Sequence, residues 1–314
     1  MKIPFEGTIS GAYRFAFSNI LSIIGIGWFP FVLLGGIVGG LGYLWLPRIH
    51  ELIDQLGKAG GHPPADPAQF ASMFAPLFGS YFLVLMALFV VQAMVNVGIM
   101  RKALGQHPGP VYFFFSLGSQ VWRLIGAYFL LTILFYGVVL LLVLAIAALS
   151  FLLQKSLPAA QLPVTIVLGI VAFLWVIYAA VRVMFFIPAV VVAENHIGIR
   201  RSWHLGRGNF WRIVGILLLI YIPVAFAVST ITSSVLQLFL GPSMGLPTGA
   251  SSPAEMQAAL KAMLNGFMRA APYYAAIQLV QLILLSGLTA GAVASAYQSV
   301  TESAKASPDL KASA

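Results

Sequence analysis

Side chains that could carry out chemistry are few in this chain, and they are scattered. No two of its five histidines lie three or four residues apart, and none of its eight acidic residues lies inside a long apolar run. Metal-assisted hydrolysis needs clustered carboxylates and imidazoles to hold the ion and orient a water molecule. The chain also has no cysteine that could serve as a nucleophile or thiolate ligand. The sequence therefore predicts no catalytic residues, no metal site and no cofactor.

One charged side chain does lie inside an apolar run. Arg182 is about 15 Å from the end of the run 164–192 if that run is helical. A charge at this depth is costly in a bilayer and is a candidate for function. In a functional interpretation Arg182 binds an anionic or lipid-like substrate on a transport pathway. In a structural interpretation it snorkels or bonds to backbone carbonyls or to amide oxygens such as those of Gln92, Asn96, Gln278 or Gln281.

A second candidate site is the basic segment that follows this run. At helical spacing, residues 199–208 place Trp203 on an apolar side and the basic residues on another, which is typical of a helix lying among lipid headgroups. The functional interpretation is that this segment binds anionic lipid or a protein partner; the alternative is that its cations only fix topology. The candidate binding residues are Arg200, Arg201, Trp203, Arg207 and Arg212.

The elements that position these residues follow from the composition. Of 314 residues, 60% are hydrophobic and 8% are charged, whereas about 25% are charged in an ordinary soluble domain. This composition predicts an all-α, polytopic integral membrane protein with one transmembrane domain over residues 1–300 and a disordered tail over 301–314. We expect Pro30, Pro188 and Pro223 to kink their spans. The six expected spans lie near residues 20–46, 73–100, 121–153, 164–192, 210–240 and 272–298.

The distribution of basic residues predicts the orientation. Eleven of the seventeen Lys and Arg residues fall on the side that holds both termini, five on the other side, and Arg182 lies within a span. Because basic loops stay in the cytoplasm, we expect both termini to be cytoplasmic in a bacterial inner membrane. The same charges favour anionic phospholipid headgroups, and not nucleic acid, as partners.

Glycine pairs four residues apart occur in the first and last spans, and such pairs allow close helix contact within a bundle or between protomers. We expect contact within the bundle, and leave a membrane-protein partner or a homo-oligomer open. The pairs are Gly35/Gly39, Gly36/Gly40 and Gly287/Gly291.

Three segments that precede alternate spans resemble one another. They cover residues 11–28, 111–129 and 200–218. Aligned without gaps, they share an amide-bearing residue at one position and a glycine at another, so we expect three interfacial amphipathic helices, each followed by a two-span hairpin. The shared residues are Asn19, Gln120 and Asn209 for the amide, which we expect to cap the next helix, and Gly25, Gly126 and Gly215.

Residues 179–219 carry a motif that resembles the membrane domain of membrane-anchored glycerophosphoryl diester phosphodiesterases and of related bacterial six-span proteins. The resemblance implies a helical membrane domain. In the anchored enzymes a separate soluble barrel performs the hydrolysis, and no loop of this chain is long enough to hold one, so we expect no enzymatic activity. The matching residues are Arg182, Pro188, Glu194, Arg201, Ser202, Trp203, Gly208, Asn209 and Trp211.

These observations favour a non-enzymatic inner-membrane protein that acts as a lipid-interacting scaffold or as a partner subunit. The alternative is a transporter or channel component for an anionic or lipid-like substrate, with Arg182 in the pathway. A continuous polar cavity from one face of the membrane to Arg182 would distinguish the two, because only a transporter needs one.

Overall fold

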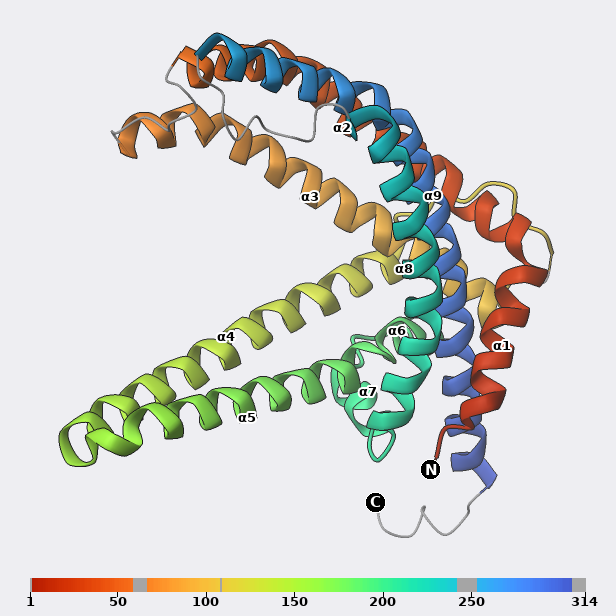
Figure 1. The fold of residues 1–314 in the computed structure, drawn as a ribbon. Coiled ribbons are helices and arrows are strands. Elements are labelled where there is room, and N and C mark those ends of the chain that lie inside the picture. Colours follow the sequence, from red (N-terminus) through yellow and green to blue (C-terminus); the bar gives the residue numbers. More distant parts are fainter. Residues whose placement is uncertain (1, 59–66, 108, 242–252, 307–314) are drawn as a thin grey trace.

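The structure, a computed structural model, describes residues 2–58, 67–107, 109–241 and 253–306 (Figure 1). Within these ranges the chain forms helices and no strand. The helices are α1 (Phe5–Ser18), α2 (Ile20–Lys58), α3 (Pro67–Ala103), α4 (Ser119–Ser156), α5 (Pro158–Met184), α6 (Ile187–Glu194), α7 (Ile199–Leu205), α8 (Phe210–Leu240) and α9 (Pro253–Ala306).

Six stretches of these helices are long and apolar enough to cross a membrane, so the protein is an all-α, polytopic membrane protein as the sequence predicts. The fourth stretch is interrupted between Met184 and Ile187, where Pro188 occupies the first turn of α6. Proline cannot donate a backbone hydrogen bond and clashes with the preceding turn. The stretches are Ile20–Gln55, Gly79–Ala103, Ser119–Ser156, Pro158–Glu194, Phe210–Leu240 and Gln257–Glu302.

Two helices extend well past the expected spans. Helix α2 continues through Pro47 to Lys58, and α9 begins at Pro253, well before the last expected span, and runs through Pro272 into it. A proline inside a helix removes one hydrogen bond, whereas ending the helix would leave several backbone groups without partners. Helix α9 also reaches Ala306, so the prediction of disorder is wrong for residues 301–306; residues 307–314 lie outside the described ranges.

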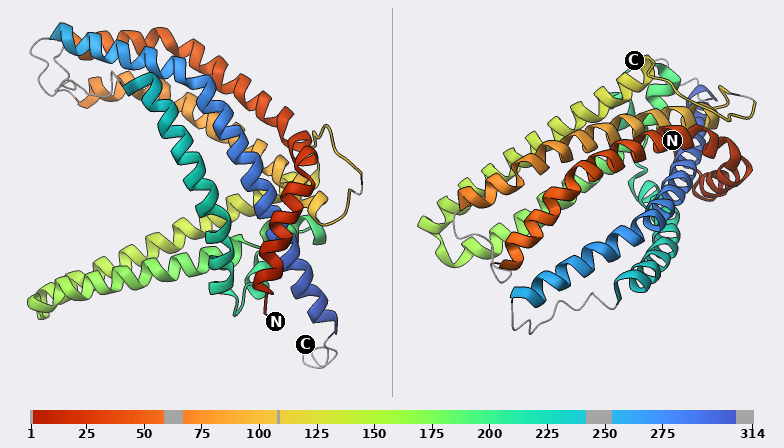
Figure 2. Two further views of the ribbon diagram at one scale, coloured as in Figure 1. Left: turned by 45° about the vertical axis from the view of Figure 1, so that its right-hand side comes forward. Right: turned by 90° about the horizontal axis from the view of Figure 1, so that it is seen from above.

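The spans pair into three hairpins, α2–α3, α4–α5 and α8–α9. The α4–α5 hairpin diverges from the α8–α9 hairpin (Figures 1 and 2). In the most apolar windows of its two spans only 6% and 0% of residues are buried in the protein, against 44% in the α9 span. The α4–α5 hairpin therefore presents nearly all of its apolar surface outward, which is favourable only in contact with lipid or another apolar surface.

The core lies where α6, which follows the α4–α5 hairpin, meets the second helices of the other two hairpins. The C-terminal part of α3, helix α6 and the C-terminal part of α9 contact one another. Their side chains are almost completely buried, as at Val95, Val190 and Ala292. These three segments form the rigid centre from which the hairpins extend.

The glycine pairs differ in their surroundings. A Cβ atom added to Gly287 would lie 2.7 Å from Ile23 Cδ1, and one added to Gly291 would lie 3.0 Å from Ala12 Cα. The α9 pair thus allows α1 and α2 to approach, which confirms packing within the bundle. For the pairs of α2 this expectation is wrong, because a Cβ atom at Gly35, Gly36, Gly39 or Gly40 would meet nothing within 4 Å.

Of the three expected amphipathic helices, two form, as α1 and α7. The expectation is wrong for the middle segment, since residues 111–118 are extended and helix α4 begins only at Ser119. This segment packs directly on α2: the Trp28 indole donates a hydrogen bond to the Tyr112 carbonyl at 2.9 Å, and a Cβ atom at Gly25 would lie 2.0 Å from the Val111 carbonyl oxygen. Contacts with α2 replace the hydrogen bonds that a helix would supply.

Three aligned positions each hydrogen bond to a backbone group: Ser22 accepts from an amide, whereas Arg123 and Arg212 donate to carbonyls. Each position lies three residues after the shared amide-bearing residue. Its side chain bonds to the backbone of the segment that leads into the next hairpin. For the third position this segment is the N-terminus, which leads into the first hairpin. The pairs are Ser22 with the Val111 amide, Arg123 with the Asn195 carbonyl, and Arg212 with the Ile3 carbonyl.

Candidate functional site

Arg182 is enclosed by α5 and α7. Its Nε donates a hydrogen bond to the Trp203 carbonyl at 3.0 Å, and its Nη1 donates one to the Tyr178 hydroxyl at 2.8 Å. The guanidinium carbon lies 4.0 Å from the centroid of the Trp203 ring, which is cation–π geometry. Arg182 is 6% exposed. The expectation that a buried charge needs oxygen partners is confirmed.

The sequence predicted the chemical type of the partners of Arg182 but not which residues they are. A backbone carbonyl accepts from it, as expected, but none of the four amide side chains named from the sequence does. Gly206 explains the close approach of α7, because a Cβ atom there would lie 2.6 Å from both Cγ and the carbonyl oxygen of Arg182. Arg182 therefore holds α7 against the end of α5.

Sequence reasoning missed Tyr178 as a partner of Arg182. The two residues lie four apart in one helix, so their contact could have been predicted from spacing. It also missed Tyr297, whose hydroxyl donates a hydrogen bond to Glu194 Oε1 at 2.8 Å. No sequence pattern links residues 103 positions apart.

The five candidate binding residues fall into two groups. Arg201 Nε donates to Glu194 Oε1 at 3.1 Å. Arg212 donates to the Ile3 carbonyl, and the Trp203 ring covers Arg182. The structure thus assigns these three residues to contacts within the protein.

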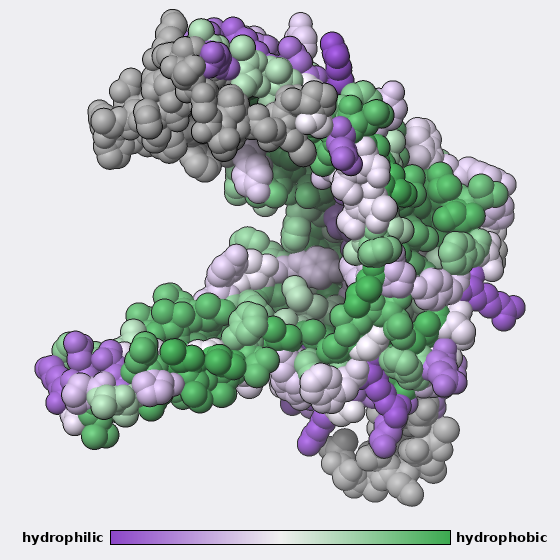
Figure 3. All heavy atoms as spheres, in the orientation of Figure 1, coloured by the Kyte–Doolittle hydropathy of each residue, from purple (hydrophilic) through white to green (hydrophobic). Residues whose placement is uncertain are grey.

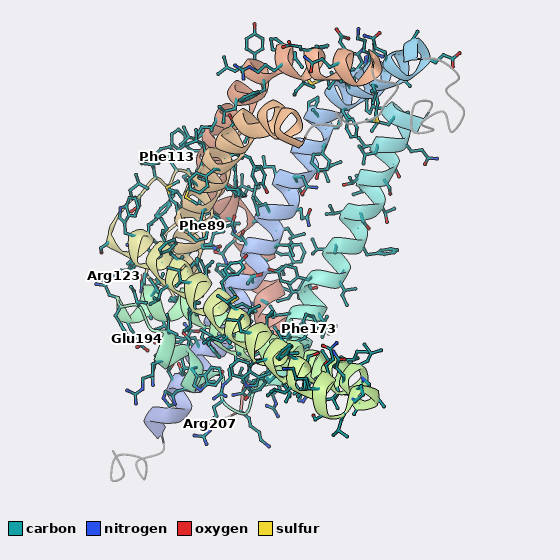
Figure 4. The ribbon with its side chains drawn as sticks, turned by 90° about the vertical axis from the view of Figure 1, so that its left-hand side faces the viewer. Phe89, Phe113, Arg123, Phe173, Glu194 and Arg207 are labelled. Carbon is teal, nitrogen blue, oxygen red and sulfur yellow. The ribbon has the colours of Figure 1, made fainter. Side chains whose placement is uncertain are left out.

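Arg200 and Arg207 form the second group. Both are exposed, and neither side chain has a hydrogen bond or ion pair within the described residues. Figure 4 shows Arg207 at the lower end of the molecule in that view, below Glu194. Two cations are therefore available to a ligand at this end.

Arg201, Glu194 and Tyr297 tie together α7, α6 and α9. His196 adds a contact of 3.8 Å from Nε2 to Glu194 Oε2. Because the Arg201 side chain is about half exposed, its ion pair contributes about 1 kcal/mol or less. Its main effect is to fix α7 at the end of the core.

Asn209 does not cap α8 with its side chain as expected. Its Oδ1 accepts a hydrogen bond from the Ile3 amide at 2.9 Å, and Ile3 is fully buried. The residue instead fastens the N-terminus to the start of α8.

An apolar groove runs along the α4–α5 hairpin and ends at α7. Its inner part has a volume of about 730 Å³ and includes Arg200 and Trp203 in its lining. Its outer part, about 680 Å³, follows the same two helices and shares Val138 and Trp175 with the inner part. From Leu168 to Val183 the groove extends about 22 Å along α5, which exceeds the ~15 Å hydrocarbon depth of one leaflet. We call these two parts the lipid-facing groove.

A third cavity, of about 500 Å³, lies where the hairpins diverge, and of its lining residues only Ala180 and Met184 also line the groove. We call it the polar cavity. Arg182 is not part of its lining. Space-filling atoms show a broad hollow between the α4–α5 arm and the rest of the molecule (Figure 3). Six polar side chains from four helices line this cavity: Gln92, Asn96, Tyr128, Tyr221, Ser286 and Thr289.

The fold and these sites define a helical, polytopic membrane protein with an exposed cation, Arg200, in the lining of an apolar groove. No group of three or more His, Asp and Glu residues among the described residues could hold a metal ion. In comparisons with family models, curated proteins and solved structures, the chain matches none.

Proposed function

We propose that this protein is a non-enzymatic, lipid-interacting scaffold or partner subunit that binds an anionic phospholipid in the lipid-facing groove. The observation that carries the proposal is the position of Arg200 at the end of that groove. The cation would meet the phosphate, and an acyl chain would lie along α4 and α5.

The energetics support this arrangement. A cation close to an anionic membrane surface contributes about 1 kcal/mol to binding. Trp203 lines the groove beside Arg200, and tryptophan favours the headgroup level. Burial of an acyl chain contributes about 0.8 kcal/mol per methylene only where it leaves water, so the groove would select chain geometry and Arg200 would select charge.

We also propose that both termini and α7 face the cytoplasm of a bacterial inner membrane. The start of α1, helix α7 and the end of α9 lie at one end of the molecule (Figure 1). The hydrogen bonds from Ile3 to Asn209 and from Tyr297 to Glu194 support their common location. This end carries Arg200 and Arg207, as the positive-inside rule requires.

A three-fold internal repeat is a further part of the proposal. The side-chain-to-backbone hydrogen bonds at the aligned positions Ser22, Arg123 and Arg212 support it. So do the shared glycines, since each approaches the segment leading into the next hairpin, at Val111, Ile197 and Phe5 in turn. We also propose that the chain is related to the membrane domains of the anchored phosphodiesterases and that it lacks their enzymatic activity.

A transporter or channel component is the second candidate. The polar cavity favours it, because amide and hydroxyl groups at membrane depth can line a pathway. Arg182 would then need to reach the pathway, but it does not line that cavity and is covered by Trp203. We therefore rank it below lipid binding.

Two arginines provide a matched test. Arg200 and Arg207 are both exposed, but only Arg200 lines the groove. After mild detergent extraction, native mass spectrometry should show about five-fold less phosphatidylglycerol on Arg200→Gln than on the unmodified protein, because about 1 kcal/mol is lost. Arg207→Gln should stay within about two-fold. Equal loss from both variants, or from neither, would contradict a specific site.

A further inference from the structure

The polar cavity lies at the convergence of the three hairpins. Helix α3 contributes Gln92 and Asn96, and α9 contributes Ser286 and Thr289. Tyr128 of α4 is held next to α3 by its edge-to-face contact with Phe89, at 6.1 Å between ring centroids. Its volume of about 500 Å³ is within the ~300–1,000 Å³ range of small-ligand sites.

The polar side chains of this cavity lack partners. None of the six makes a side-chain hydrogen bond to another described residue, and Thr289 Oγ1 is completely buried without one. Asn96 lies seven residues before the end of α3, about 10 Å into the membrane from that end. At such depth an unsatisfied amide or hydroxyl costs about 1–3 kcal/mol, so a hydrogen-bonding ligand would be strongly favoured.

The cavity holds no charge. No Lys, Arg, His, Asp or Glu residue lines it. The buried cation Arg182 does not line the cavity, and its guanidinium donates hydrogen bonds to the Trp203 carbonyl and the Tyr178 hydroxyl. A phosphate or an amine placed here would be an unpaired charge in a medium of low polarity. The chemistry excludes ions and charged headgroups, and it favours neutral hydroxyl and ester groups.

The remaining lining is apolar, with Val181, Phe185, Leu217 and Leu282 among its residues. These side chains match hydrocarbon, and the divergence of the α4–α5 hairpin leaves the hollow of Figure 3 beside them. A ligand that is polar at one end and apolar at the other fits both parts of the wall.

We propose that the polar cavity binds a neutral glycerolipid, a mono- or diacylglycerol, whose free hydroxyl and ester carbonyls bond to Gln92, Asn96 and Thr289. This site adjoins the inner part of the lipid-facing groove, with which it shares Ala180 and Met184, but Arg200 does not line it. The amides donate to the ester carbonyls, and the buried Thr289 hydroxyl exchanges a hydrogen bond with the glycerol hydroxyl. The acyl chains leave between α4 and α8.

Photolabelling of the full chain in nanodiscs tests this site. The probe is a diacylglycerol with a diazirine in its acyl chain, and the readout is the labelled fraction and the labelled peptides. Thr289→Val and Asn96→Leu should each reduce labelling of α3 and α9 peptides about five-fold. Thr232→Val is the matched control, because Thr232 Oγ1 is also buried without a partner but does not line the cavity.

The result expected includes unchanged labelling in Thr232→Val and Arg200→Gln, and no competition by phosphatidylglycerol. Thr289→Val keeps the side-chain shape and carries the test if Asn96→Leu does not fold. Labelling that is unaffected by Thr289→Val, or that phosphatidylglycerol abolishes at equal concentration, would overturn the proposal. An unlabelled cavity would mean that water alone satisfies these groups, which overturns it as well.

Discussion

The guanidinium of Arg182 lies 4.0 Å from the centre of the Trp203 indole and donates to the carbonyl of the same residue. One side chain thus satisfies a buried charge with a backbone oxygen and an aromatic face at once. Because Trp203 belongs to α7, the contact sets the position of the helix that carries the exposed Arg200.

This relationship predicts the effects of changing Arg182. Arg182→Ala would leave the Trp203 carbonyl and the Tyr178 hydroxyl without a donor, so we expect a loss of about 2–4 kcal/mol in stability. Arg182→Gln should recover part of it. Thermal unfolding in detergent measures the stability of both variants. An Arg182→Ala protein that folds with unchanged stability but no longer transports a substrate would instead support a role of Arg182 in a transport pathway.

The second prediction concerns the close approach of α7 to α5. Gly206→Ala places a methyl group 2.6 Å from two atoms of Arg182, so either the arginine or α7 must move. We expect a stability loss of about 1–3 kcal/mol. Gly39→Ala is the control, because its methyl group meets nothing within 4 Å; equal unfolding temperatures for the two variants would refute the packing described here.

Some features of the fold could be predicted from the sequence and others could not. The spans follow from hydropathy, and the burial of Arg182 follows from the cost of an isolated charge. Residues 111–118 were wrongly predicted to be helical, because their aromatic residues suit a headgroup helix as well as a segment packed on α2. Local composition does not report such a tertiary contact.

The polar cavity was equally hidden from the sequence. Gln92 and Asn96 were named only as possible partners of Arg182, and nothing linked them to Ser286 or Thr289, which lie about 190 residues away. Whether such groups converge depends on the rotation and tilt of each helix. Packing sets both of these quantities, and periodicity alone does not.

A third prediction concerns the N-terminus. Ile3 is held by Asn209 through its amide and by Arg212 through its carbonyl. Asn209→Ala should cost about 1–2 kcal/mol, since it leaves a buried amide unpaired, and should increase hydrogen exchange at residues 3–5. Unchanged exchange protection would show that the clamp does not order this end.

The orientation gives a fourth prediction. A reporter enzyme that is active only in the periplasm, fused after Ala314, should be silent because both termini are proposed to be cytoplasmic. The same reporter inserted between Ser156 and Pro158, at the α4–α5 turn, should be active. The opposite pattern would invert the membrane face assigned to Arg200.

The most direct test of the central claim is a cryo-electron microscopy map of the protein in nanodiscs that contain phosphatidylglycerol. The account predicts an elongated density in the groove between α4 and α5, with its headgroup within hydrogen-bonding distance of Arg200 and its chain passing Trp175. An empty groove, or a lipid whose headgroup contacts Arg207 but not Arg200, would contradict it.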